Sequence, residues 1–393
     1  MTDDPEHRPI TRRLRRELII TVVAVVALLL ALRFWSADRD DETAGGDAFD
    51  VAGALSGEDD AAGFSRVVGP EPLQFPDDHG PHPDYRHEWW YVTGNVQDET
   101  GRHFGFQATL FRFSVASEPP EHGSALATNQ LWMGHLAVTD TDAGEFHHRE
   151  RFVRGGAGLA DGVASPFRVW VEDWEMAGVD DEAMPMEIRF QEDDLGVDMT
   201  VTPRKPLVLQ GDQGYSRKGD HPGNASRYYS WTRLAAEGSV VVGGESHQVD
   251  GEAWMDREWG TSTLAEDQIG WDWFSVQLED GRDVMFYQLR LEDGEIDARS
   301  KGLLVEADGA SRVLNSDDVA LNATRHWDSP VGMRYPVAWR MRIPEADLDL
   351  ALEAVLDDQE LRGAFRYWEG AIRVTGNTGP DGYGYAELTG YDL

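Results

Sequence analysis

Four carboxylic acids that are adjacent to a tryptophan or lie two residues from one are candidates for acid catalysis. They are Glu88, Asp256, Glu258 and Asp272. A carboxyl group that is buried among indoles loses its hydration, so its pKa rises and it keeps its proton. The face of an indole also stabilises a nearby cation by about 1–2 kcal/mol once water is excluded. This combination indicates a site that protonates a carbon–carbon double bond rather than one that hydrolyses an ester or amide.

Alternation along a strand decides which of these acids can share a surface. Asp256 and Glu258 point to one face of an extended strand, while Arg257 between them points to the other. Trp254 lies on the same face as the two acids, which favours an interior over a solvent-facing surface. We therefore expect Asp256 or Glu258 to be the catalytic proton donor.

The other two acids have structural explanations that compete with a catalytic one. Asp272 alternates with Trp271 and Trp273, so it points away from any pocket into which both indoles project. Glu88 can accept the N–H of the adjacent indole or pair with Arg86 at the entry of a hairpin. Both remain catalytic candidates of second rank.

Aromatic and histidine side chains near these acids are candidates for binding an apolar ligand. They are Trp90, Trp254, Trp259, Trp271, Trp273, Tyr287, His79, His82 and His135. The spacing of His79 and His82 would also suit a metal, but loop histidines beside aspartates are more often hydrogen-bond partners, and the chain has no HExxH pair. We therefore expect neither a metal nor a cofactor.

Other nucleophilic chemistries lack their residues. The chain has no cysteine, which excludes disulfides and a thiolate nucleophile. No Gly-x-Ser-x-Gly elbow occurs, and Ser216, the nearest serine candidate, lies in a glycine-flanked loop beside Asp212. A serine hydrolase is therefore disfavoured.

Two predicted β-hairpins present the candidate residues. The run 88–96 opens with an acid and two indoles, and a related pattern returns at 270–278. Each run leads to a Gly-Arg turn, at 101–102 and at 281–282, and then to an aromatic strand that ends in arginine. Apolar alternation and Asp-Gly turns continue along the body, whereas helical periodicity is almost absent.

These patterns predict an all-β protein with two consecutive antiparallel β-barrels, at residues 64–262 and 263–393. A pair of two-sheet sandwiches is the alternative. Closing a sheet into a barrel removes its exposed edges and leaves an interior that can hold one apolar ligand. We therefore expect the ligand chamber inside a barrel.

The first 37 residues are typical of a membrane anchor. Arginines at 12, 13, 15 and 16 precede an apolar run at 18–32, and Phe34 and Trp35 follow it. A cleaved secretory signal is the alternative, but a suitable cleavage site is hard to find. We expect a single-pass signal anchor (1–37) in the inner, cytoplasmic membrane, an acidic flexible linker (38–63) and a body on the periplasmic side.

The charge of the chain limits its partners. It carries 72 acidic and 35 basic residues, a formal net charge of −37. Nucleic acid and anionic membrane surfaces repel such a body. We therefore expect no nucleic-acid partner, and contact with the membrane only through the N-terminal helix.

An ordered series of motifs between residues 75 and 391 resembles the carotenoid 1,2-hydratase / AttH-like family. The motifs are Phe75-Pro76-x-Asp78-His79-Gly80-x-His82, Glu88-Trp89-Trp90-Tyr91-x-Thr93-Gly94, Met133-Gly134-His135, Leu209-Gln210-Gly211-Asp212, Ala253-Trp254-Met255-Asp256-Arg257-Glu258-Trp259, Gly270-Trp271-Asp272-Trp273-Phe274 and Glu387-Leu388-Thr389-Gly390-Tyr391. The resemblance implies two lipocalin-like domains. In the hydratase branch it implies cofactor-free addition of water to a terminal isoprenoid double bond. Other members are often encoded near transporter genes or are labelled secreted hydrolases.

The residues and the resemblance together leave three hypotheses. The first is an anchored, extracytoplasmic lipocalin-like protein that binds an isoprenoid or lipid-like ligand and hydrates it by acid catalysis, as a carotenoid 1,2-hydratase-like hydro-lyase. The second is a non-catalytic carrier of lipids or lipoproteins, or an accessory subunit of an ABC-type permease. The third is a secreted hydrolase. An acid inside the cavity without an arginine partner favours the first hypothesis, whereas the second is compatible with an all-apolar lining.

Overall fold

The computed structural model describes residues 62–120, 124, 125, 127–262, 264, 265 and 267–391. The predicted signal anchor and nearly all of the predicted linker lie outside these residues. Within the described ranges, no helix combines the length and hydropathy that a membrane crossing requires. The same ranges contain only three short 3₁₀ helices, η1 (Asp77–His79), η2 (Ser316–Asp318) and η3 (Pro344–Ala346), and otherwise strands and loops.

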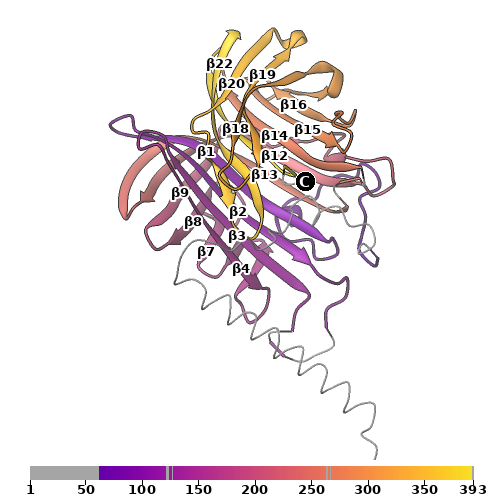
Figure 1. The fold of residues 1–393 in the computed structure, drawn as a ribbon. Coiled ribbons are helices and arrows are strands. Elements are labelled where there is room, and N and C mark those ends of the chain that lie inside the picture. The colour runs from indigo at the N-terminus through magenta and orange to yellow at the C-terminus, as the bar shows by residue number, and fades with distance from the viewer. Residues whose placement is uncertain (1–61, 121–123, 126, 263, 266, 392–393) are drawn as a thin grey trace, which may run out of the picture. The chain divides into compact units, whose positions relative to one another are not determined.

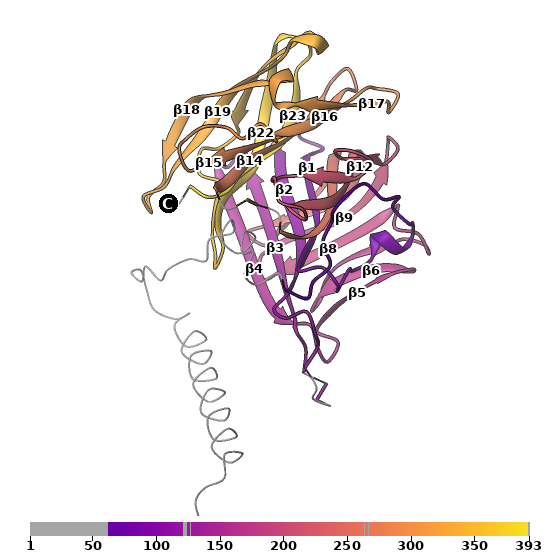
Figure 2. The same cartoon turned by 90° about the vertical axis from the view of Figure 1, so that its right-hand side faces the viewer.

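The first thirteen strands form one antiparallel sheet. They are β1 (His87–Asp98), β2 (His103–Ser114), β3 (Gln130–Asp140), β4 (Glu145–Arg154), β5 (Ala160–Ala164), β6 (Phe167–Val171), β7 (Trp174–Gly178), β8 (Met186–Glu192), β9 (Leu195–Pro203), β10 (Val208–Leu209), β11 (Tyr215–Arg217), β12 (Ala225–Val242) and β13 (Glu245–Ser262). Their order is β4-β3-β2-β1-β13-β12-β9-β8-β7-β6-β5, and β10 and β11 add to β12. Figure 2 shows β1 to β4 running side by side.

The last ten strands form a second antiparallel sheet. They are β14 (Gln268–Leu278), β15 (Asp283–Leu291), β16 (Lys301–Val305), β17 (Ser311–Asn315), β18 (Ala320–Asp328), β19 (Arg334–Ile343), β20 (Leu348–Ala354), β21 (Glu360–Arg362), β22 (Arg366–Thr378) and β23 (Gly382–Leu388). Their order is β17-β16-β15-β14-β23-β22-β20-β19-β18, and β21 adds to β22. Figure 1 shows the strands of the first sheet in indigo to pink and those of the second in orange to yellow.

Each sheet curls into a nearly closed antiparallel barrel, which confirms the all-β, two-barrel prediction. In both barrels the first strand pairs with the last, β1 with β13 and β14 with β23. The two predicted hairpins are β1–β2 and β14–β15. Gly101 and Gly281 close their turns with φ angles of 86° and 87°, a left-handed conformation that residues with a Cβ rarely adopt.

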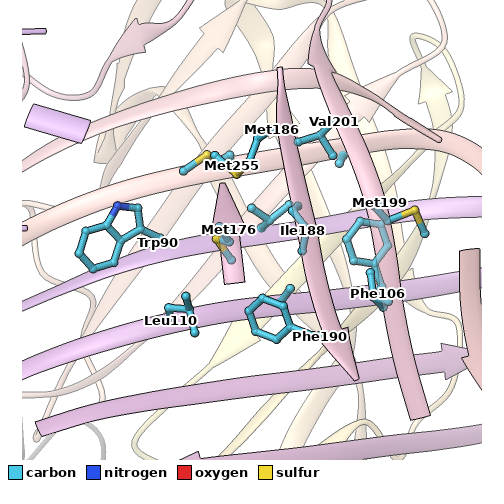
Figure 3. Packing of buried hydrophobic residues seen from close by; sticks show 14 of the residues in the cluster. Trp90, Phe106, Leu110, Met176, Met186, Ile188, Phe190, Met199, Val201 and Met255 are labelled. Carbon is cyan, nitrogen blue, oxygen red and sulfur yellow. The ribbon is translucent and has the colours of Figure 1, made fainter. Parts of the chain in front are cut away.

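Alternate residues of the hairpins pack into two different hydrophobic clusters, one inside each barrel. On β1, Trp90 and Val92 point into the first barrel, and on β14, Phe274 and Val276 point into the second. Figure 3 shows Trp90, Leu110 and methionines such as Met176 filling the first interior. Each large apolar side chain that is fully buried contributes about 1.5–3 kcal/mol. The buried side chains of the two clusters fill both interiors.

The opposite faces of the same strands meet between the barrels. Buried side chains from these faces and from neighbouring segments form a third cluster, made of Tyr91, Tyr228, Trp254, Leu264, Trp273, Met285, Tyr287, Leu289, Ala371 and Tyr385. Polar contacts cross this junction as well: Asn95 Nδ2 donates to the Gly384 carbonyl at 3.1 Å, and Gln277 Nε2 donates to the Ala253 carbonyl at 2.9 Å. Lys205 pairs with Asp283 at 2.7 Å. The barrels are thus joined by packed side chains and by hydrogen bonds.

Candidate active site

A cavity opens at this junction, on the outer faces of both hairpins. The centres of water-sized spheres can occupy about 90 Å³ of it, and the whole space between its walls, with open solvent at the mouth included, is about 970 Å³. Its lining comprises Trp89, Tyr91, Phe111, Phe113, Met133, His135, Lys218, Tyr228, Asp256 and Glu258 from the first part of the body, and Leu264, Trp271, Trp273, Tyr287, Leu289, Phe365, Tyr367 and Glu387 from the second. The expectation that the chamber lies inside a barrel is wrong, because tryptophan, phenylalanine and methionine side chains fill the interiors.

The period of two along the strands explains this lining. On β1, β2 and β3 the residues that face the cavity alternate with residues that point into the hydrophobic interior of the first barrel. Trp89 flanks Trp90 in this way, and Phe111 flanks Leu110. Partly exposed aromatic residues, including Phe113 and Phe365, form the outer part of the wall. Beyond it, the exposed ring of Phe152 stacks on Phe365 with 5.7 Å between ring centroids.

Asp256 is a buried acid of the cavity that has no cationic partner within the described residues. It lies on β13 between Tyr91 of β1 and Ser230 of β12 and is only 3% exposed. Ser230 and Tyr228 donate hydroxyl hydrogen bonds to it, and the indole of Trp254 donates a third at 2.7 Å. Burial raises the pKa of Asp256 to about 7, although these donors oppose the rise. Within the described residues it makes no ion pair.

Glu258, two residues further along β13, has the opposite environment. Its carboxylate pairs with the Lys218 ammonium and accepts a hydrogen bond from Ser226. The ammonium of Lys218 lies 5.7 Å from the ring centroid of Tyr228 and 5.5 Å from that of Tyr287. Sequence reasoning did not select Lys218, although it is one of only three lysines in the chain. The cavity therefore holds one paired and one unpaired acid on the same strand.

Glu387 on β23 is a third acid of the cavity, and sequence reasoning did not select it either. It lies opposite Trp273 in the strand pairing and accepts a hydrogen bond of 3.0 Å from the indole of Trp271. One side of it faces the cavity, so it is only partly covered, yet burial raises its pKa to about 8. The only sequence signal was its place at the start of the last family-like motif.

Glu88 lies inside the first barrel and not on the cavity. It forms ion pairs with Arg112 and Arg257 and accepts the backbone N–H of His82 at 2.9 Å. Burial alone would raise the pKa of Glu88, but the two guanidinium groups outweigh it and hold the pKa well below its usual range. An acid that stays ionised cannot donate a proton, so we assign Glu88 a structural role. The sequence-based alternative, Arg86, is not its ion-pair partner in this cluster.

Asp272 lies on the barrel side of β14, while Trp271 and Trp273 face the cavity. Arg290 pairs with it at 3.1 Å and Tyr391 donates a hydrogen bond at 2.9 Å. Burial raises the pKa of Asp272, and the charge of Arg290 offsets part of this rise. Its position on the opposite face of β14 from the cavity and its arginine partner remove it from the candidate proton donors.

Of the candidate ligand-binding residues, the structure brings His135, Trp271, Trp273 and Tyr287 to the cavity. The others lie elsewhere: Trp90, Trp254, Trp259, His79 and His82. Trp254 does not line the cavity, but its indole donates a hydrogen bond to Asp256. The remaining four pack at the first core, where the η1 loop covers the barrel. There the ring of His82 stacks on that of Trp259 at 4.0 Å and the ring of His79 stacks on that of Trp231 at 5.5 Å.

No group of three or more metal-ligating side chains comes together anywhere in the described ranges. His79 instead forms a hydrogen bond with the hydroxyl of Tyr229 at 2.7 Å, and His82 forms one with Asp78 at 2.9 Å. The two histidines therefore act as hydrogen-bonding groups of a loop.

Comparison with known proteins gives a family and a fold. A family model described as AttH-like matches residues 66–391. The crystal structure of a putative AttH from Nitrosomonas europaea is 35% identical, covers 84% of this chain and 100% of its own, and superposes with a TM-score of 0.74. Kievitone hydratase from Nectria haematococca shares the fold at 17% identity, with 84% of this chain and 96% of its own covered and a TM-score of 0.64. No curated protein matches the chain.

Proposed function

Because this chain belongs to the AttH-like family, we propose that it binds a hydrophobic ligand between its two lipocalin-like barrels and adds water to a carbon–carbon double bond of that ligand. The reaction is cofactor-independent acid catalysis, with Asp256 as the proton donor. The ligand class is isoprenoid or lipid-like, since the lining is mainly aromatic and aliphatic. A solved structure of the same fold is a hydratase, which supports this reaction class.

The observation that carries the proposal is the environment of Asp256. It is buried in an apolar cavity, has no cationic partner within the described residues and has a pKa raised to about 7. A carrier would need only an apolar lining, because an unpaired buried acid weakens the binding of an oily molecule. An acid near neutrality, by contrast, suits a proton donor.

The reaction follows from the arrangement of the lining. The Asp256 carboxyl transfers its proton to one alkene carbon, and the other carbon becomes a cation. The indoles of Trp271 and Trp273 line the same space, and indole faces stabilise such a cation by about 1–2 kcal/mol each when water is excluded. A water molecule then forms the new C–O bond, and its proton returns to the Asp256 carboxylate. The sum is alkene plus water giving an alcohol, with the acid regenerated.

Glu258 and Lys218 give this reaction a fixed ion pair in a mainly apolar cavity. Glu258 lies on the same face of β13 as Asp256, two residues away, and Lys218 pairs with Glu258 from the segment before β12. Fixed charges of this kind can orient the water that attacks the cation. We assign the pair the role of holding that water and not of donating the proton.

The membrane location is part of the proposal and depends on the N-terminal segment. The arginine cluster and apolar run of residues 12–32 support a single-pass inner-membrane anchor with the barrels on the periplasmic side. A carrier that works with an ABC-type permease remains the competing function. It would share the anchor and the cavity and would not require Asp256.

The first experiment identifies the ligand and then tests the acid. Mass spectrometry of organic extracts from the purified full-length chain reports what it retains. Acyclic isoprenoids and unsaturated fatty acids are then incubated with the protein in heavy-oxygen water, and incorporated oxygen is measured. We expect Asp256→Asn to retain the ligand but to lower incorporation by at least about a hundredfold, as for loss of a general acid.

The matched control is Glu237→Gln, which changes an exposed acid on the neighbouring strand β12. It should leave incorporation unchanged. Undiminished incorporation by Asp256→Asn would show that another group donates the proton. Retention of the ligand without any incorporation by the unmodified chain would favour the carrier.

A further inference from the structure

The second barrel contributes two acids that the proposed reaction does not use, one that is fully buried and one that faces the cavity. We propose that Glu369 and Glu387 form a protonated carboxyl pair in the cavity wall, and that Tyr367, His135 and Glu150 connect this pair to the protein surface as a proton path. This inference rests on the proposed function, because the charge of this pair acts on Asp256, the proposed proton donor.

The strand pairing brings the two glutamates together. Glu369 on β22 is directly opposite Glu387 on β23, and directly opposite side chains lie on one face with Cβ atoms about 4.5–5.5 Å apart. Glu369 is fully buried, whereas Glu387 faces the cavity. The hydroxyl of Tyr91, itself a cavity residue, donates a hydrogen bond to Glu369 Oε1. The second oxygen, Oε2, is buried and makes no hydrogen bond within the described residues.

The charges around the pair favour retained protons. From β13, Asp256 and Glu258 add negative charge, and from the segment before β12, Lys218 adds positive charge that acts on Glu387. The phenols that face Glu369 come from β1, β22 and β23: Tyr91, Tyr367 and Tyr385. If all four acids were ionised, three of the charges would lack a partner. Burial disfavours this and raises the pKa of Glu369 well above its usual value.

A chain of side chains leads outward from Glu369. Tyr367 lies two residues away on the same face of β22, and its hydroxyl opposes the rise that burial causes in the pKa of Glu369. Its hydroxyl meets His135 Nδ1 at 2.6 Å and accepts a hydrogen bond from Gln107 at 3.1 Å. On the far side of the imidazole, Nε2 meets the carboxylate of Glu150 at 3.1 Å, and this carboxylate is 17% exposed. The chain therefore begins at a fully buried acid and ends at a group that solvent reaches.

Two hydrogen-bond arrangements of this chain differ by one transferred proton. In the first, Tyr367 donates to His135 Nδ1, and the Nε2–H of the neutral imidazole donates to Glu150. In the second, Glu369 has passed its proton to Tyr367, and Tyr367 has passed its own to Nδ1. The imidazole is then an imidazolium that is paired with Glu150. Every oxygen and nitrogen keeps a chemically allowed number of protons in both arrangements. Protons can therefore move along this path while all bonds between heavy atoms stay unchanged.

The path makes Glu387 the end of a proton supply to the chamber. A proton that leaves Glu387 is replaced by the proton of Glu369. Glu369 then receives a new proton through Tyr367 and His135. Glu387 and Asp256 interact electrostatically, so the same supply sets the charge around the proton donor even when a ligand excludes water from the cavity. Glu369, Tyr367, His135 and Glu150 are positioning residues in this scheme, since they act through Glu387.

Infrared spectroscopy of the ligand-free full-length chain tests the pair without any turnover. A protonated carboxyl has a C=O stretch separate from that of a carboxylate, and it shifts when the proton is exchanged for deuterium. We expect such a band at neutral pH that loses intensity in Glu369→Gln and in Glu387→Gln. If one variant does not fold, the other tests the same band. Absence of the band in the unmodified chain would overturn the proposal.

Deuterium exchange of this band tests the path. We expect Tyr367→Phe to slow the exchange by about tenfold, as for loss of one hydrogen-bonded step. The matched control is Tyr385→Phe, which removes a hydroxyl that also interacts with Glu369 but lies off the path, and it should exchange at the unmodified rate. Equal rates in all three proteins would show that protons reach the pair by another route. Because no substrate is used, these outcomes are separate from the failure or success of the hydratase proposal.

Discussion

The interior of the first barrel and the cavity between the barrels both bury a carboxyl group among indoles, with opposite results. In the barrel, Glu88 lies between Arg112 and Arg257, and its pKa falls below the usual range. In the cavity, Asp256 has only neutral hydrogen-bond donors, and its pKa rises to about 7. Burial opposes ionisation at both places. The comparison teaches that a countercharge, and not proximity to tryptophan, decides whether a buried acid is structural or can donate a proton.

The largest effect that would test this contrast is the loss of the Glu88 charge. Glu88→Gln leaves two buried guanidinium groups without a carboxylate, and we expect it to lower the free energy of unfolding by about 3–5 kcal/mol. The pKa of Glu88 is depressed in the folded state, so its contribution is present above the unfolded value of about 4.3 and is lost as the pH falls. Urea unfolding of both proteins between pH 3 and pH 8 measures this. A variant as stable as the unmodified chain at neutral pH would show that the ion pairs contribute nothing.

Asp256→Asn should have an effect of the opposite sign. Because the folded pKa of about 7 exceeds the unfolded value of about 3.9, the ionised acid destabilises the fold increasingly as pH rises through that window. We therefore expect the stability of the variant relative to the unmodified chain to increase between about pH 4 and pH 7. Above about pH 7 the difference in stability should stay constant. The same urea series provides the measurement. A stability difference that does not vary with pH would contradict the raised pKa.

The fold follows closely from local sequence patterns. Alternation and the Gly-Arg turns at Gly101 and Gly281 identify both hairpins, because strand faces and tight turns depend on neighbouring residues. The same alternation separates Asp272 from the indoles on either side of it. Pairing of Asp256 and Glu258 on one face also follows from spacing alone. These properties need no knowledge of the rest of the chain.

The location of the site does not follow from such patterns. Alternation distinguishes two faces of a strand, but not which face meets the second barrel, so the chamber was expected inside a barrel. The partners of the acids are distant in sequence: Arg257 lies 169 residues from Glu88, and Trp271 lies 116 residues from Glu387. Lys218 meets Glu258 across 40 residues. Countercharges of this kind come from tertiary contacts, which a single sequence does not reveal.

The most direct measurement is the titration of Asp256 itself. Carbon NMR of the full-length chain labelled at aspartate carboxyl carbons resolves the signal, which is assigned by its disappearance in Asp256→Asn. The account predicts a midpoint near pH 7, the value that burial without a countercharge gives. A midpoint near the ordinary aspartate value of about 3.9 would mean that Asp256 is an ionised, solvated group, and it would contradict its role as the proton donor of the cavity.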